Sequence, residues 1–323
     1  MAALRTAAPP ATRSGPGVPA RSGPEVVPAR PGPEVVPARP GPEVVPARPG
    51  PEVVPARPGP EVVPARPGPE VVPARPGLRR VEQVMGTPIS LDLADDLPRS
   101  VLDDLADEAF GWLREVDARF STYRADSEVS RFDRGEVLLS EASPDLRLVL
   151  ERCADLWGAT DGWFDAYATG SFDPSGYVKG WAAQVASDRL LAAGAANHCL
   201  NAGGDVRLRG HSPAGRPWRV GLQHPWDRSA TFLVLTGTDL AVATSGVYER
   251  GHHVVDPRRG EPARGLRSVT VVGRDLGVAD AYATAAVAMG SAGAGWLGRL
   301  AGHEHAVVTD SGRCLRSPRL PVA

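Results

Sequence analysis

Six tandem copies of the nonapeptide GPEVVPARP occupy residues 23–76 and prevent this part of the chain from forming a packed core. Each copy holds three prolines, so 18 of the 33 prolines in the 323-residue chain lie here. Proline lacks a backbone N–H donor, and the tract offers no aromatic residue and only isolated Val-Val pairs. We expect residues 1–77 to form a disordered, largely polyproline II tail and residues 78–323 to form a globular domain.

Charge and composition exclude several classes of protein. Outside the repeats and the 22 residues before them, the chain has 27 basic and 32 acidic residues, whereas a nucleic-acid surface is basic and clustered. The three cysteines, Cys153, Cys199 and Cys314, are widely spaced and predict reduced thiols. No apolar run has the length of a membrane span or a signal-peptide core. We therefore expect a cytoplasmic protein that binds no nucleic acid and has no membrane span.

Hydrophobic periodicity predicts both helices and strands after the repeats. Helices are expected at residues 98–119, 144–158, 177–193 and 278–290. Strands are expected at residues 81–93, with an interruption at residues 85–87 where Gly86 permits close backbone approach, and at residues 198–210, 218–226, 231–246 and 266–273. Because the strands and helices do not alternate strictly, the pattern favours a single α+β domain with a mixed or antiparallel sheet and flanking helices.

The helix expected at 278–290 carries an acid and a hydroxyl at a spacing that suits a shared ligand. Asp280 and Thr284 are four residues apart and therefore lie on one face of a helix. Two oxygen ligands suit Mg²⁺, which takes one or two carboxylates and completes its shell with water and substrate phosphate. The alternative is a capped core helix with a buried threonine.

Lys179 is the only lysine in the chain, and it falls in the first turn of the helix expected at 177–193. The helix dipole disfavours a cation there, which a bound anion would resolve; a free surface lysine is the alternative. The segments Gly203-Gly204-Asp205 and Thr244-Ser245-Gly246 fall at strand ends, where backbone amides can face a ligand.

Aromatic and histidine side chains in loop segments suggest further contacts with a ligand. Tyr123, Trp163 and Phe164 can sandwich a planar group, although core packing is the alternative. Of the adjacent His252 and His253, at most one can face a site, where it could act as a general base; otherwise it is a solvated loop residue. Gly203-Gly204-Asp205 is not a GxGxxG fingerprint, and the motifs GxxxxGK[ST] and GxSxG are absent, which argues against the usual dinucleotide, nucleoside triphosphate and serine hydrolase sites.

Four segments occur in a defined order along the chain. They are MGT at Met85, STYRADSEVSRF at Ser121, a block from FDPSGYVKGWA at Phe172 to GGD at Asp205, and a block TSG…HHVVDPRRG…SVTVV…ADAYATAA from Thr244 to Ala286. Together they resemble the FAD:protein FMN transferase family, the ApbE-type flavin transferases, over residues 81–316. The resemblance implies an enzyme that binds FAD and, with Mg²⁺, transfers the FMN half to a Thr or Ser hydroxyl of an acceptor protein and releases AMP.

The resemblance also implies roles for individual residues. Asp280 and Thr284 would bind Mg²⁺ through their side chains and Gly176 through its carbonyl oxygen, while His253 would deprotonate the acceptor hydroxyl. The acceptor is expected to carry a motif of the type Asp-Gly-x-x-Ser/Thr-Gly/Ala-Thr. The residues expected to contact FAD, with the aromatic ones around the flavin in a single cavity, are Met85, Tyr123, Trp163, Phe164, Asp165, Asp173, Lys179 and Val255.

Two positions depart from the family pattern. Ala283 stands where some relatives have a second acid before the metal-binding threonine, which would weaken or retune metal affinity. Gln184 stands where many relatives have Asp. Two alternative functions follow: an FAD pyrophosphatase that uses water as the nucleophile and gives FMN and AMP, or a flavin-binding protein without turnover.

Overall fold

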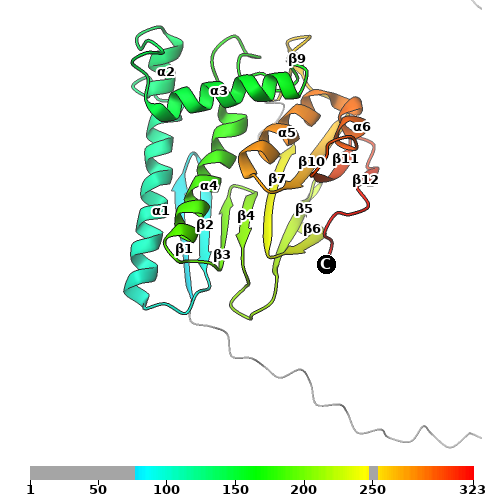
Figure 1. Cartoon of the computed structure of the whole chain (residues 1–323). Helices are drawn as coiled ribbons and strands as arrows, with labels where there is room; N and C mark the ends of the chain where they lie inside the picture. The colour runs from blue at the N-terminus through cyan, green and yellow to red at the C-terminus, as the bar shows by residue number, and fades with distance from the viewer. Residues whose placement is uncertain (1–76, 247–253) are drawn as a thin grey trace, which may run out of the picture. The chain divides into compact units, whose positions relative to one another are not determined.

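An antiparallel sheet organises residues 77–246 and 254–323, the part of the chain that the computed structural model describes. These residues fall within one compact unit. The strand order in the sheet is β1-β2-β3-β4-β7-β10-β11-β12, and every neighbouring pair is antiparallel (Figure 1). The eight strands are β1 (Leu78–Val84), β2 (Thr87–Leu93), β3 (His198–Ala202), β4 (Asp205–Arg209), β7 (Asp239–Gly246), β10 (Leu266–Gly273), β11 (Glu304–Thr309) and β12 (Cys314–Arg316). The predicted disordered tail covers residues 1–77, and residues 1–76 lie outside the described part of the chain.

Helices cover one face of this sheet, with α1, α4 and α5 lying across it (Figure 1). The helical elements are α1 (Arg99–Phe120), α2 (Glu128–Asp133), α3 (Pro144–Ala159), α4 (Ser175–Ala192), α5 (Leu276–Ala288), a 3₁₀ turn (Gly290–Ala292) and α6 (Gly293–Leu297). None of the helices among the described residues combines the length and apolar character that a membrane crossing requires. The α+β prediction with an antiparallel sheet and flanking helices is confirmed.

Two apolar clusters form, one on each face of the sheet, because successive side chains of a strand point to opposite faces. Ala241 and Ala243 of β7 belong to the larger cluster with the helices, whereas Val242 between them belongs to the smaller one. The smaller cluster includes Trp218 and Leu235 from a two-stranded ribbon of β5 (Trp218–His224) and β6 (Asp227–Gly237). Another short ribbon pairs β8 (Val255–Asp256) with β9 (Glu261–Pro262).

The strand expected at 198–210 is in fact a hairpin, and the interruption expected within 81–93 is the turn of another hairpin. The strand expected at 81–93 turns at Met85 and Gly86, whose φ angles are 55° and 70°, and the strand expected at 198–210 turns at Gly203 and Gly204, with φ angles of 61° and 101°. A two-residue turn with left-handed backbone preserves the alternation of side chains on both sides, so periodicity alone cannot detect it. The strand expected at 231–246 is likewise divided, between Gly237 and Asp239.

Helices α4 and α5 approach each other closely at two glycines. A Cβ atom added at Gly180 would lie 2.5 Å from the Leu276 carbonyl oxygen and 2.9 Å from the Asp280 Cβ. One added at Gly277 would lie 2.8 Å from the Tyr177 ring. Because neither position has room for a side chain, glycine there brings the turn that carries Lys179 against the turn that carries Asp280.

Candidate functional site

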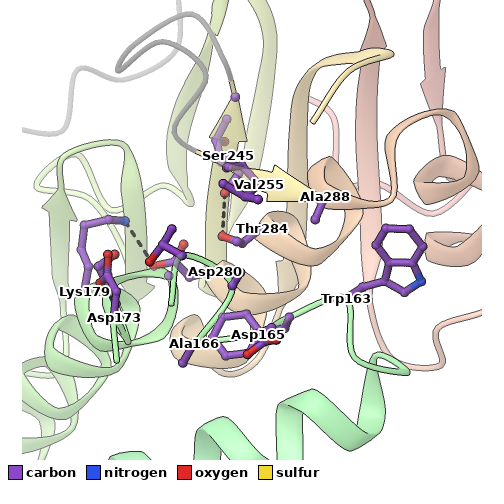
Figure 2. A pocket seen from close by; sticks show the side chains of 18 of the residues that line it. Trp163, Asp165, Ala166, Asp173, Lys179, Ser245, Val255, Asp280, Thr284 and Ala288 are labelled. Atoms are coloured by element: carbon purple, nitrogen blue, oxygen red, sulfur yellow. Dashed lines mark hydrogen bonds and ion pairs between the residues drawn. The ribbon is translucent and has the colours of Figure 1, made fainter. Parts of the chain in front are cut away.

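An open cavity of about 1020 Å³, including the space at its mouth, lies where α4 and α5 meet the end of β7. Its wall contains nine of the residues expected from the sequence to bind FAD or Mg²⁺. These are Trp163, Phe164, Asp165, Asp173, Gly176, Lys179, Val255, Asp280 and Thr284 (Figure 2). Segments more than 100 residues apart in the sequence therefore form one wall.

Met85 and Tyr123 lie in a second hollow of about 670 Å³ rather than in this cavity. The two hollows share Ser175 and Lys179, so they adjoin. The residues expected to line one flavin cavity therefore lie in two adjoining hollows. Tyr123 is 99% exposed, which also excludes the alternative that it packs in the core. His253, the expected base, lies outside the described residues.

Lys179 is held between two buried carboxylates at the cavity. Its ammonium forms an ion pair with Asp205 and a hydrogen bond of 3.3 Å with Asp280 Oδ2. Asp205 is 0% exposed and Asp280 is 4% exposed. Within residues 77–246 and 254–323 these are the carboxylates that pair with Lys179. The three charged groups sum to −1, so the group as a whole attracts a cation.

The placement of Lys179 corrects the sequence prediction. Helix α4 begins at Ser175, two residues earlier than expected, so Lys179 lies in its second turn. The lysine is neither a free surface residue nor one that needs an anion to offset the helix dipole, because Asp205 and Asp280 already stabilise its charge.

Thr284 extends the polar wall by one helical turn from Asp280. Its hydroxyl lies 3.2 Å from the Ser245 hydroxyl at the end of β7 (Figure 2). A Cβ atom added at Gly176 would lie 3.3 Å from Thr284 Oγ1, so the backbone at Gly176 lies against this hydroxyl. A carboxylate, a hydroxyl and a nearby backbone therefore share one corner of the cavity.

This donor set fits Mg²⁺ better than it fits a transition metal. The described residues include no group of three or more His, Cys, Asp or Glu side chains arranged to hold a metal ion. Mg²⁺ needs only one or two carboxylates, because water and substrate phosphate supply the remaining oxygen ligands. Asp280, Thr284 and the Gly176 carbonyl are thus an appropriate set for Mg²⁺ in the presence of a phosphate-bearing substrate.

The two departures from the family pattern lie outside the cavity wall. Ala283 is fully buried in the core between the helices and the sheet. Gln184 accepts a hydrogen bond from the Leu276 N–H at 3.1 Å and donates to Asp188 at 3.0 Å, so it connects α4 to the beginning of α5. Gln184 therefore helps to align the two helices instead of contacting a ligand.

The far end of the cavity is aromatic. Figure 2 shows the Trp163 indole toward the opposite end from Lys179. The Arg258 guanidinium stacks on this indole, 4.2 Å from the ring centroid, and donates a hydrogen bond of 2.8 Å to Asp161 Oδ2. Arg258 thereby joins the β8–β9 ribbon to the loop after α3. Phe164 is 3% exposed and also lines the cavity, so it both packs in the core and forms part of the cavity wall.

Sequence reasoning missed the roles of the Asp205 and Ser245 side chains. Both segments lie at strand ends as expected, and Gly203 and Thr244 to Gly246 line the cavity, but the Thr244 amide donates to Asp205 Oδ1 instead of facing a ligand. The pairing of Asp205 with Lys179, however, depends on how β4 packs under α4. An aspartate that follows two glycines gives no indication in the sequence that it will pair with Lys179.

Comparisons with known proteins agree with this geometry. The ApbE family model matches residues 85–171 and 168–307. An FAD:protein FMN transferase of Vibrio cholerae is 34% identical over 128 residues, or 36% of this chain and 38% of that protein. One of Rhodobacter capsulatus is 38% identical over 121 residues, or 35% of this chain and 23% of that protein. The matched part of the chain thus spans well under half the length of these two relatives.

A solved structure matches over a longer stretch. The flavin transferase ApbE from Vibrio cholerae superposes with a TM-score of 0.64 at 25% identity, covering 75% of this chain and 98% of that structure. The matched family model, the shared fold and the cavity built from the four ordered segments together show that the chain belongs to the ApbE family.

Proposed function

We propose that this protein is a Mg²⁺-dependent FAD:protein FMN transferase, which moves the FMN half of FAD to a Thr or Ser hydroxyl of an acceptor protein and releases AMP. The observation that carries the proposal is the polar corner of the cavity, where Lys179, Asp280 and Thr284 converge from α4 and α5. The printed names of the relatives, FAD:protein FMN transferase, support the same activity.

The reaction breaks one phosphoanhydride bond and forms one phosphoester bond. The acceptor oxygen forms a bond with the FMN phosphorus, and the bond from that phosphorus to the oxygen shared with AMP breaks. Bound Mg²⁺ would neutralise charge on the pyrophosphate as it develops. Asp280, Thr284 and the Gly176 carbonyl would hold that ion.

The chain's own residues position and stabilise the substrate. Lys179 offers a positive charge at the shared edge of the two hollows, where a pyrophosphate between the flavin and the adenosine would lie. The apolar wall at Phe164 and Trp163 offers a surface for a planar ring. We assign the acceptor's proton to His253, which directly precedes the cavity-lining Val254 in the sequence.

A peptide assay tests the proposal. The purified chain is incubated with FAD, Mg²⁺ and a peptide of the type Asp-Gly-x-x-Ser/Thr-Gly/Ala-Thr. The mass of the peptide is then measured by mass spectrometry. We expect the added mass of one FMN and an equal amount of AMP. Release of AMP with free FMN and no adduct would instead identify an FAD pyrophosphatase. Binding of intact FAD without AMP release would identify a flavin-binding protein.

A pair of variants on α5 tests the metal role. Asp280→Asn keeps the shape of the side chain but removes its charge, and we expect it to lower transfer by at least about 100-fold. Asp275→Asn is the matched control, because Asp275 caps the same helix by accepting from the Val278 N–H and asparagine caps equally well. Activity of Asp280→Asn at the level of the control would overturn the assignment.

A histidine variant tests the base. His253→Ala should slow transfer while leaving FAD binding nearly unchanged, since a general base acts on the acceptor rather than on FAD. Fluorescence titration with FAD distinguishes the two effects. A loss of FAD affinity matching the loss of rate would make His253 a cofactor contact.

A further inference from the structure

Asp205 is a fully buried carboxylate behind the cavity, and the cavity-lining residues do not include it. We propose that Asp205 is a positioning residue that holds the Lys179 ammonium and so limits the competition of this ammonium with a divalent cation for Asp280. This inference rests on the Mg²⁺ site of the proposed function and adds a residue that contacts neither the ion nor the substrate.

The contacts of Asp205 show why Lys179 is drawn to it. One oxygen, Oδ1, accepts a hydrogen bond of 3.0 Å from the Thr244 N–H, and the other, Oδ2, pairs with Lys179. A carboxylate with no exposure to water requires a compensating charge, because desolvation otherwise costs several kcal/mol. The Lys179 ammonium supplies that charge, and its contact with Asp280 is a long one of 3.3 Å.

Removing the charge of Asp205 would act on the cation site in two ways. The three charged groups sum to −1 with Asp205 present and to zero without it, which weakens the attraction for a divalent ion. Among the described carboxylates, Asp280 would also become the remaining partner of Lys179, so the ammonium would compete with the ion for the same oxygen. Both effects predict weaker binding of the cation.

A simpler role is that Asp205 only ties β4 to β7 through the Thr244 amide. Asp205→Asn separates the two roles. The asparagine carbonyl oxygen can still accept the Thr244 N–H, whereas the charge that holds Lys179 is gone. Asp95→Asn is a control for loss of a buried carboxylate, because Asp95 is 9% exposed and both its oxygens accept hydrogen bonds, from the Asn197 N–H at 2.9 Å and from the Asn197 side chain at 2.7 Å.

The experiment measures binding of Mn²⁺ by electron paramagnetic resonance, with Mn²⁺ alone and with Mn²⁺ plus ADP, whose diphosphate resembles that of FAD. We expect Asp205→Asn to bind Mn²⁺ at least about tenfold more weakly than the unsubstituted protein. The double variant Lys179→Met/Asp205→Asn is measured with Mn²⁺ alone, because Lys179 is also expected to contact a diphosphate. It removes the competing ammonium and restores the charge of −1, so its affinity for Mn²⁺ alone should return to within about threefold. Asp95→Asn should leave the affinity unchanged.

Each result decides the inference. Equal affinity in Asp205→Asn and the unsubstituted protein overturns it, as does an equal loss in Asp95→Asn. If Asp205→Asn does not fold, the double variant decides, because an affinity more than about tenfold below that of the unsubstituted protein overturns the inference. If the unsubstituted protein binds no Mn²⁺ with ADP present, the metal site itself fails, and the peptide assay shows separately whether FMN transfer remains.

Discussion

The close approach of α4 and α5 at Gly180 predicts a specific effect on both stability and the site. Gly180→Ala would place a Cβ atom 2.5 Å from the Leu276 carbonyl oxygen and 3.0 Å from the Gly277 Cα. Both are backbone atoms, so no side-chain rotation relieves the overlap. The helices must separate by several tenths of an ångström, which also moves the Gly176 backbone of α4 away from Thr284 of α5 and so spreads the groups expected to bind the cation.

The magnitude follows from two opposing terms. Overpacking of this kind costs about 2–3 kcal/mol, and the better helix propensity of alanine offsets about 1 kcal/mol. We therefore expect a net loss of about 1–2 kcal/mol in the free energy of unfolding. Gly111→Ala is the matched control, because Gly111 also lies inside a long helix, α1, and a Cβ atom there meets no atom within 4 Å. It should gain about 1 kcal/mol.

Urea unfolding followed by circular dichroism measures both variants, and a titration with Mn²⁺ measures the site. The midpoint should fall for Gly180→Ala and rise for Gly111→Ala, with a weaker affinity for Mn²⁺ in the former. A midpoint for Gly180→Ala equal to or above that of Gly111→Ala would refute the reasoning that these backbones are in contact.

Three further predictions concern other parts of the chain. Burial lowers the pKa of His198 from 6.5 to about 4, so on acidification the unfolded chain protonates His198 before the folded protein does. The free energy of unfolding therefore falls by about 3 kcal/mol as pH drops from about 7 to about 4. His198→Gln should remove this part of the pH dependence in urea titrations, and an unchanged dependence on pH would contradict the prediction. A thiol reagent should label Cys314, which is exposed, in the native protein, whereas burial raises the pKa values of Cys153 and Cys199 to about 12 and should protect them until unfolding; three fast thiols in the native protein would be the contrary result. Deletion of residues 2–76 should leave transfer to a peptide acceptor within about twofold, because that tract lacks the composition of a packed core; a large drop would show that the repeats contribute to catalysis.

The helices and the antiparallel sheet could be predicted because their signals are local. The apolar spacing in α1, with Leu102, Leu105, Ala109, Leu113 and Val116 all buried, has the period of a helix that faces a core. Strand β10 has the bounds expected from its apolar run. Gly86 indicated the interruption near Met85, but the hairpin turn at Gly203 could not be predicted from periodicity, because a two-residue turn leaves the alternation intact on both sides.

The sequence by itself determined which residue types are available for chemistry: one lysine, an acid and a hydroxyl four residues apart, and aromatic residues in loops. Only the tertiary structure decided how they combine. Lys179 pairs with Asp205 and Asp280 because glycines at 180 and 277 let α4 and α5 touch, and because β4 begins, at Asp205, beneath α4. Charge pairing inside a protein depends on distance and burial in three dimensions, and neither is a property of the local sequence.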